Sequence, residues 1–387
     1  MNVIKDPIHG HVPITDSELA LLDQPEMQRL RGIKQVAMAP LVYPGANHTR
    51  FEHSIGTMHL ASEMARRLEL SKEEAGLLRS VALLHDVGHS AFSHETEILV
   101  KRFLKKDHEQ LGLERIKSTF LKDLVSEQFS FQEFEKAFMG EGIGNLISFE
   151  LGADRMDYLL RDSHYTGVAY GVIDTDRIVH TVRMHNGKAV VDRRGLEAAE
   201  SLLIARFLMF STVYYHHAVR IAGAMLRKAV ETAVENKSLS TSELASLPDY
   251  GLLNALKKDG RAKELVERLE GRKLFKRALI LPYGGLPGEV KNSLETLEGI
   301  NELEDSVAEA AGLAKGSVVL DYQKSHGEVS LESVKVLIGG EEKNLEALSE
   351  LVKSLKKDEE ERRTLIVACA GSEIEKVKKT SEGLLIA

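Results

Sequence analysis

The chain has 387 residues, a formal net charge of −8 and a single cysteine, Cys369. Its length allows two or three domains, and a content of 43% hydrophobic and 28% charged residues is typical of a soluble globular protein. One cysteine excludes an intrachain disulfide, and the acidic balance argues against a nucleic-acid-coating surface. No apolar run reaches the roughly 18 residues of a membrane span, and the first ten residues lack the apolar core of a signal peptide. We therefore expect a cytoplasmic protein with neither a membrane nor a nucleic-acid partner.

Apolar residues recur at helical spacing through most of the first 230 residues, which predicts a mainly helical region. Gly88 is placed to end one of these helices. The helices are predicted over about 16–22, 25–33, 58–68, 77–85, 96–105, 150–162 and 196–235.

The sequence changes character toward its C-terminal end. Helical spacing continues over 240–275, and runs rich in β-branched residues then predict strands over 317–322, 334–338 and 364–368. A helix is expected over about 342–357. We therefore predict a mostly α fold with a helical core (1–235), a helical extension (236–312) and a small C-terminal α+β domain (313–387).

The most informative local feature is the pair His85-Asp86, which ends an otherwise apolar helix. Adjacent imidazole and carboxylate groups need partners when they are buried, and a divalent metal ion would satisfy both. Seven of the fifteen histidines fall between residues 48 and 108, which indicates a site. A metal site that keeps open positions can activate water, so the pattern favours a metal-dependent hydrolase.

Further ligands must come from elsewhere in the chain, and His53 and Asp154 are the best candidates. Asp154, Tyr158 and Asp162 are four residues apart and share one face of a predicted helix. Taken alone, this spacing is also typical of a solvated amphipathic helix. His59 is expected to be a core residue, and His48 a turn residue.

These residues resemble the H…HD…D pattern of the HD-domain phosphohydrolases. Motifs at 6–11, 28–35, 43–46 and 50–56 are similar to one branch of that family, the dNTP triphosphohydrolases, and the resemblance covers roughly residues 2–275. It implies an HD-domain helical core in which His53, His85, Asp86 and Asp154 bind one divalent metal ion. The ion could be Mg, Mn, Fe, Ni or Zn.

The resemblance also implies hydrolysis of a dNTP to a deoxynucleoside and inorganic triphosphate. His94 would protonate the leaving 5′-oxygen, and the same catalytic network would include His89, His108 and Glu109. Substrate would be held by a larger set of residues. The phosphate-binding members would be Arg50, Arg155, Tyr158 and Arg206, and the sugar-side members Gln35, Val36, Asp162 and Tyr214.

A regulatory guanine-nucleotide pocket is a further family feature. Its positions are matched here by Val3, Ile4, Asp23, Gln28 and Arg31, whereas Asn2 and Lys5 depart from it. The resemblance therefore leaves nucleotide activation open, and it implies a homodimer or homotetramer.

Two other functions remain as alternatives. One is a different HD-domain activity, such as a nucleotide phosphomonoesterase or phosphodiesterase. The other is a nucleotide sensor that has lost catalysis, although the metal ligands and His94 are all present.

Overall fold

The computed structural model describes residues 2–322 and 334–386; residues 1, 323–333 and 387, parts of the predicted first and last domains, lie outside the described residues. The described residues are mostly helical, which confirms the predicted fold class. Among them, no helix combines the length and the apolar character that crossing a lipid bilayer requires.

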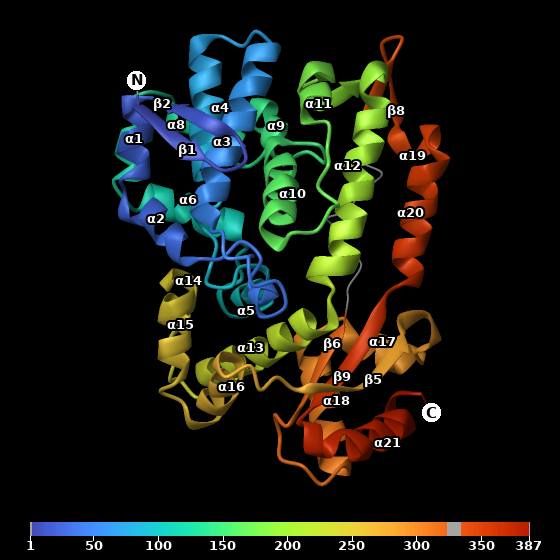
Figure 1. Cartoon of the computed structure of the whole chain (residues 1–387). Helices are drawn as coiled ribbons and strands as arrows, with labels where there is room; N and C mark the ends of the chain where they lie inside the picture. Colours follow the sequence, from blue (N-terminus) through green and yellow to red (C-terminus); the bar gives the residue numbers. More distant parts are fainter. Residues whose placement is uncertain (1, 323–333, 387) are drawn as a thin grey trace.

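The N-terminal region combines a small β-hairpin with a set of packed helices (Figure 1). The hairpin, which the sequence interpretation missed, pairs β1 (Asn2–Asp6) with β2 (Gly10–Ile14). The helices are α1 (Asp16–Leu22), α2 (Pro25–Arg29), η1 (Leu30–Gly32), η2 (Ala39–Leu41), α3 (Arg50–Arg67), α4 (Lys72–Leu84), α5 (His94–Leu104), α6 (His108–Lys117), α7 (Leu121–Ser126), α8 (Phe131–Phe138), η3 (Gly142–Gly144), α9 (Asn145–Ser148), α10 (Ala153–Thr166) and α11 (Thr175–Thr181).

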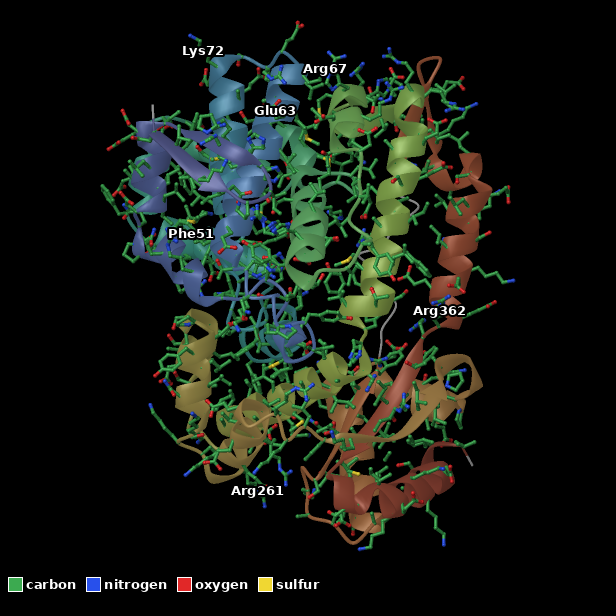
Figure 2. All side chains as sticks on the ribbon, in the orientation of Figure 1. Phe51, Glu63, Arg67, Lys72, Arg261 and Arg362 are labelled. Atoms are coloured by element: carbon green, nitrogen blue, oxygen red, sulfur yellow. The ribbon has the colours of Figure 1, made fainter. Side chains whose placement is uncertain are left out.

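Helices α3, α4 and α10 form the frame of the core. A capping box between Thr49 and Glu52 fixes the start of α3, and its apolar face packs against α4 and α10. Phe51 marks the end of α3 that points into the molecule, and Arg67 marks the opposite end (Figure 2). The inner end of α3 therefore meets the end of α4 and the start of α10.

The helix predicted over 196–235 is interrupted. Helix α12 (Leu196–Met209) runs into a π-turn, η5 (Phe210–Tyr214), and α13 (His217–Glu235) then starts in a new direction. The Tyr215 amide donates to the Phe210 carbonyl at 2.9 Å, five residues back. Such a turn inserts a residue into the helical pattern, which periodicity alone does not reveal.

The later part of the chain builds two sheets among further helices. These helices are α14 (Thr241–Ser246), α15 (Asp249–Leu256), α16 (Gly260–Glu270), α17 (Gly288–Leu294), α18 (Leu297–Ala310) and α21 (Ile374–Leu385). One sheet has the order β5 (Lys276–Pro282), β9 (Thr364–Cys369), β6 (Val318–Tyr322). The other has the order β3 (Val182–His185), β4 (Lys188–Asp192), β7 (Lys335–Ile338), β8 (Glu341–Asn344). Strands β6, β7 and β9 lie where strands were predicted.

The helix expected over 342–357 is wrong in its first part. Residues Glu341–Asn344 form β8, paired with β7 across the turn Gly339-Gly340, and α19 (Leu345–Leu348) and α20 (Glu350–Glu361) follow. Both glycines have positive φ, which favours a hairpin over the helical preference of the next residues. Strand β7 pairs with β4 and strand β9 with β5, so strands of the predicted last domain pair outside it. The boundaries at 235 and 312 stay predictions.

Candidate metal centre and active site

The structure brings together the four side chains that the sequence singled out as metal ligands. His53 comes from the first turn of α3, His85 and Asp86 follow α4, and Asp154 lies in the first turn of α10. His53 Nε2 lies 3.0 Å from Asp154 Oδ1, and His85 Nε2 lies 3.3 Å from Asp86 Oδ1. The remaining measured separations, His85 Nε2 to Asp154 Oδ1 and His53 Nε2 to Asp86 Oδ2, are both 3.9 Å.

These positions fit a divalent metal ion. Ligand atoms at about 2.1 Å from an ion lie about 3 to 4 Å apart, and one ligand atom from each of His53, His85 and Asp86 lies within 4.8 Å of the other two, with Asp154 beside both imidazoles. His85 donates its Nδ1 proton to the Ala82 carbonyl at 2.7 Å, so Nε2 presents a lone pair to the cluster. That buried nitrogen has no hydrogen-bond partner among the described residues, as expected of a ligand atom.

A second layer of buried side chains orients His53. Its Nδ1 donates to Asp157 at 2.8 Å, and Asp157 also accepts from His9 at 2.6 Å and from Arg161 at 2.9 Å. Arg161 continues the chain of contacts to Asp6 at 2.9 Å. A carboxylate behind a ligating imidazole fixes its tautomer and strengthens its ligand atom. The sequence interpretation missed Asp157 and His9 in this role.

The buried side chains behind His53 pack so closely against α3 that no side chain fits at Gly56. A Cβ atom at Gly56 would lie 1.8 Å from Asp157 Oδ1 and 2.4 Å from Arg161 Nη2, so only glycine fits. Burial alone would raise the pKa of Asp157, but Arg161, His53 and His9 outweigh it and hold that pKa well below its usual range. Burial would lower the pKa of His53, but Asp154, Asp157 and Asp86 raise it to about 10. The carboxylates therefore create a strong demand for positive charge, which a metal ion satisfies.

Arg50 connects the metal-ligand cluster to His94. The buried guanidinium donates to Asp86 Oδ2 at 2.7 Å, and its Nη2 lies 3.3 Å from His94 Nε2. Burial would raise the pKa of Asp86, but Arg50, His85 and His89 outweigh it and hold the pKa well below its usual range. Asp86 is therefore ionised, as a metal ligand would be.

Three histidines beside this cluster form an aromatic group. The ring of His89 stacks on His108 with 4.1 Å between centroids and meets the ring of His94 edge-on at 5.4 Å. His89 Nε2 lies 3.2 Å from Asp86 Oδ1. Burial and the charge of Arg50 lower the pKa of His89 well below its usual value, so His89 is neutral.

Glu97, which the sequence interpretation missed, binds both outer histidines. It accepts a hydrogen bond from His108 Nδ1 at 3.0 Å and lies 3.5 Å from His94 Nδ1. Burial would raise the pKa of Glu97, but His108 and His94 outweigh it and lower the pKa far below its usual range. The i,i+3 spacing from His94 could have indicated Glu97. Glu109 is exposed on α6, its charge acts on His108, and its place in the catalytic network stays a prediction.

Asp162 forms a polar group with His48 and Tyr214. One carboxylate oxygen accepts from His48 Nε2 at 2.7 Å, and the other accepts from the Tyr214 hydroxyl. Burial and the Asp162 charge raise the pKa of Tyr214 well above its usual value, so it is a hydrogen-bond donor. His48 is buried and stacks on Tyr165, so the expectation of a turn residue is wrong for its side chain.

Gln35 and Val36 lie next to the backbone of His48. The Gln35 amide donates to the His48 carbonyl at 3.1 Å, and both side chains are buried. Gln35 Oε1 has no hydrogen-bond partner among the described residues. It is therefore a candidate contact for a substrate hydroxyl.

Two of the predicted phosphate-binding arginines, Arg155 and Arg206, share the carboxylate of Glu150, which the sequence interpretation missed. Arg206 Nη1 donates to Glu150 Oε2, and Arg155 Nε lies 3.3 Å from the same oxygen. Burial raises the pKa of Tyr158. The charges of both arginines lower this pKa, and those of Asp154 and Asp162 raise it. Tyr158 therefore lies among the two arginines, the predicted ligand Asp154 and the polar group of Asp162.

The five candidate regulatory residues lie at the N-terminal end of the chain. Arg31 donates to Gln28 at 2.8 Å, whereas Asp23 caps α1 and is exposed. Val3 and Ile4 lie on β1, and Val3 is exposed. The structure thus joins Gln28 and Arg31, and a nucleotide site here stays a prediction.

Two family models match the chain. The HD domain covers residues 50–211, and the HD associated region covers residues 173–386, which is more than half of the chain. The first match contains the metal-ligand cluster, the three histidines and Asp162, whereas His48 and Tyr214 lie just outside it.

Curated and solved relatives extend these matches. An uncharacterized protein of Methanocaldococcus jannaschii is 42% identical over 73% of this chain and 60% of its own length. A deoxynucleoside triphosphate triphosphohydrolase SAMHD1 homolog of Dictyostelium discoideum is 28% identical over 71% of this chain and 59% of its own length. The chain therefore spans about 60% of the length of these curated relatives. The crystal structure of a phosphohydrolase from Bacteroides thetaiotaomicron superimposes with a TM-score of 0.75 at 25% identity, covering 96% of this chain and 100% of that one. The chain belongs to the family of HD-domain proteins that carry the HD associated region.

Proposed function

We propose that this HD-domain protein cleaves deoxynucleoside triphosphates to a deoxynucleoside and inorganic triphosphate. The observation that carries the proposal is the Arg50 bridge between the metal-ligand cluster and His94. It brings an ionised metal ligand, a phosphate-binding cation and a proton donor into one contiguous site. The name of the Dictyostelium relative supports the same reaction.

His53, His85, Asp86 and Asp154 would hold the metal ion, whose identity among Mg, Mn, Fe, Ni and Zn the ligand set leaves open. When bound, such an ion supplies Lewis acidity and a water molecule of lowered pKa. Asp157 keeps the Nδ1 proton of His53 in place, and Ala82 does the same for His85. Nε2 is thereby the nitrogen of each imidazole that would face the ion.

His94 would supply the proton for the leaving group. Glu97 faces Nδ1 of His94, so Nε2 is the nitrogen that faces Arg50 and the reacting phosphate. The oxygen of a water molecule would form a bond to the α-phosphorus as the water loses a proton to solvent, the bond from phosphorus to the 5′-oxygen would break, and the Nε2 proton of His94 would pass to that oxygen. Glu97 stabilises the protonated ring before the transfer.

The remaining residues would orient the substrate. Arg50, Arg155 and Arg206 offset the charge of the triphosphate. The Asp162–Tyr214 pair and Gln35 offer acceptors and a donor to a sugar hydroxyl. Val36 adds apolar bulk beside them.

Glu150 favours one alternative. Its carboxylate between Arg155 and Arg206 reduces the net positive charge available to a long phosphate chain. A nucleotide with fewer phosphates would suit this balance, so a phosphomonoesterase or phosphodiesterase is the second candidate. Guanine-nucleotide activation, a homodimer or homotetramer, and a cytoplasmic location remain predictions.

Product identity tests the proposal. With Mn²⁺ or Mg²⁺, we expect the protein to release triphosphate from dNTPs, as detected by ion-exchange chromatography, and not from nucleoside monophosphates or NTPs. Asp154→Ala should abolish this release, whereas Asp176→Ala, at an exposed carboxylate on α11, should leave it unchanged. Release of orthophosphate alone would establish the alternative.

A further inference from the structure

The segment that leads into His94 has an unusual backbone. Phe92 and Ser93 have φ values of 53° and 42°, a region that residues with a side chain rarely adopt. Helix α5 starts directly after them with His94, whose side chain is 63% exposed. Such a conformation persists only where surrounding groups hold it. The position of His94 therefore depends on contacts made by its neighbours.

One of these contacts comes from α15, within the HD associated region. Asp249 accepts a hydrogen bond from the Phe92 amide at 2.7 Å, and its second oxygen accepts from the Lys34 amide at 3.0 Å. The carboxylate is buried. It thus fixes the backbone two residues before His94.

A second contact comes from α13 and acts on the residue after His94. Arg227 donates to Glu95 at 2.5 Å and also to Asp321 on β6. Asp321 is held in turn by Arg220, whose Nε lies 2.5 Å from it. A Cβ atom at Gly223 would lie 2.2 Å from the Glu95 carboxylate, so the α13 backbone presses directly on this group. Helix α13 lies between α5 and the sheet that contains β6 (Figure 1).

We propose that Asp249 and Arg227 of the HD associated region are positioning residues for His94, so that the associated region takes part in catalysis. The inference rests on the proposed role of His94 as the proton donor. Asp249 fixes the chain before His94, and the Glu95–Arg227–Asp321 contacts fix the chain after it. Neither positioning residue contacts the metal ligands.

Helix α13 offers a matched control for Arg227. The adjacent Lys228 also makes ion pairs, to Glu304 on α18 at 2.5 Å and to Glu231 at 3.3 Å. Its ammonium therefore anchors the same helix without touching α5. Lys228→Met and Arg227→Met remove equal charge from neighbouring positions, and only the second removes the contact to Glu95.

The test compares these two variants on two substrates. We expect Arg227→Met to lower kcat for the deoxynucleoside triphosphate about 10- to 100-fold, with KM and bound metal within about twofold of wild type. The loss should be much smaller on bis(p-nitrophenyl) phosphate, whose phenolic leaving group needs little protonation. Lys228→Met should retain wild-type kcat on both substrates, and Arg227→Lys should recover part of the loss. An equal loss on both substrates, or equal losses in both variants, would overturn the proposal.

Hydrogen exchange separates this inference from the proposed function. Arg227→Met should speed amide exchange in peptides covering residues 90–97, and Lys228→Met should not. If the wild-type protein releases no triphosphate, the proposed function fails while this measurement still decides whether the associated region holds the segment. If Arg227→Met does not fold, Glu95→Gln removes the same ion pair from the other side. Unchanged exchange in the folded variant would overturn the inference.

Discussion

The proposed metal-binding face, which holds His53, His85, Asp86 and Asp154, and the proposed proton-donor face, which holds His94, are built differently. On the metal face, His53, Asp86 and Asp157 are almost fully buried, and contacts within residues 6–161 hold them. On the donor face, His94 is largely exposed, and its supporting contacts come from α13 and α15. The metal face is thus a preformed part of the core. The donor face depends on contacts from a later part of the chain.

Asp157→Asn should give the largest effect, because it breaks the support of the metal face. The amide leaves the buried Arg161 and His53 without a full counter-charge, which costs about 3–5 kcal/mol in the free energy of unfolding. Metal affinity should also fall about 10- to 100-fold. Urea unfolding and metal content check both, with Asp123→Asn, at an exposed carboxylate on α7, as the control. Unaltered metal content would argue against this role of Asp157.

His94→Ala should give the next effect and should be confined to the donor face. We expect kcat to fall about 10²- to 10⁴-fold while metal content and unfolding midpoint stay near the wild-type values. His11→Ala, at an exposed histidine on β2, is the matched control. Loss of metal in His94→Ala would make His94 a ligand and remove the distinction between the faces.

The smallest expected effect concerns how the free energy of unfolding varies with pH. The contributions of Asp249 and Asp157 vary with pH in opposite directions. Burial, only partly offset by the Lys34 and Phe92 amides and by the charges of Lys34 and Arg50, raises the pKa of Asp249 to about 6. An acid with a raised folded-state pKa stabilises the fold below its unfolded pKa near 4, and this stability is lost as the pH rises through 6. The depressed pKa of Asp157 acts in the opposite direction, because its contribution is lost as the pH falls below about 4.

Urea unfolding at pH 4 and pH 7 measures this difference. We expect the unfolding free energy of wild type relative to Asp249→Asn to fall by about 1–2 kcal/mol over that range. Lys34, Arg50 and Arg29 are the charged groups that interact with Asp249. A difference that does not vary with pH would show that Asp249 is ionised throughout.

The sequence predicted the metal face better than the donor face for a physical reason. Two of the predicted metal ligands form the His85-Asp86 dyad, whose adjacent polar groups are hard to explain at the end of an apolar helix. Glu97 and Glu150 look like ordinary helix-surface carboxylates, and only the folded arrangement shows which charges they meet. Asp157 was missed because it lies between the predicted metal ligand Asp154 and the predicted phosphate-binding residue Tyr158.

The strands show the same limit. Asn186-Gly187, with φ values of 50° and 74°, is a hairpin turn signal that could have revealed β3 and β4. The strands β6, β7 and β9 were predicted from their β-branched runs. Their partners were not, because long-range pairing leaves no local trace in the sequence.

The parallel pairing of β4 with β7 has a consequence for synthesis on the ribosome. Val191 pairs with Val336, so one side of β4 has no partner until about 145 further residues have been made. At roughly 5–20 residues per second, that delay is about 7–30 s. During this interval the nascent chain carries an open, valine-rich strand edge, which other chains can join. Chaperone binding to nascent chains that end between residues 195 and 330 is therefore the expected cellular counterpart of this sheet.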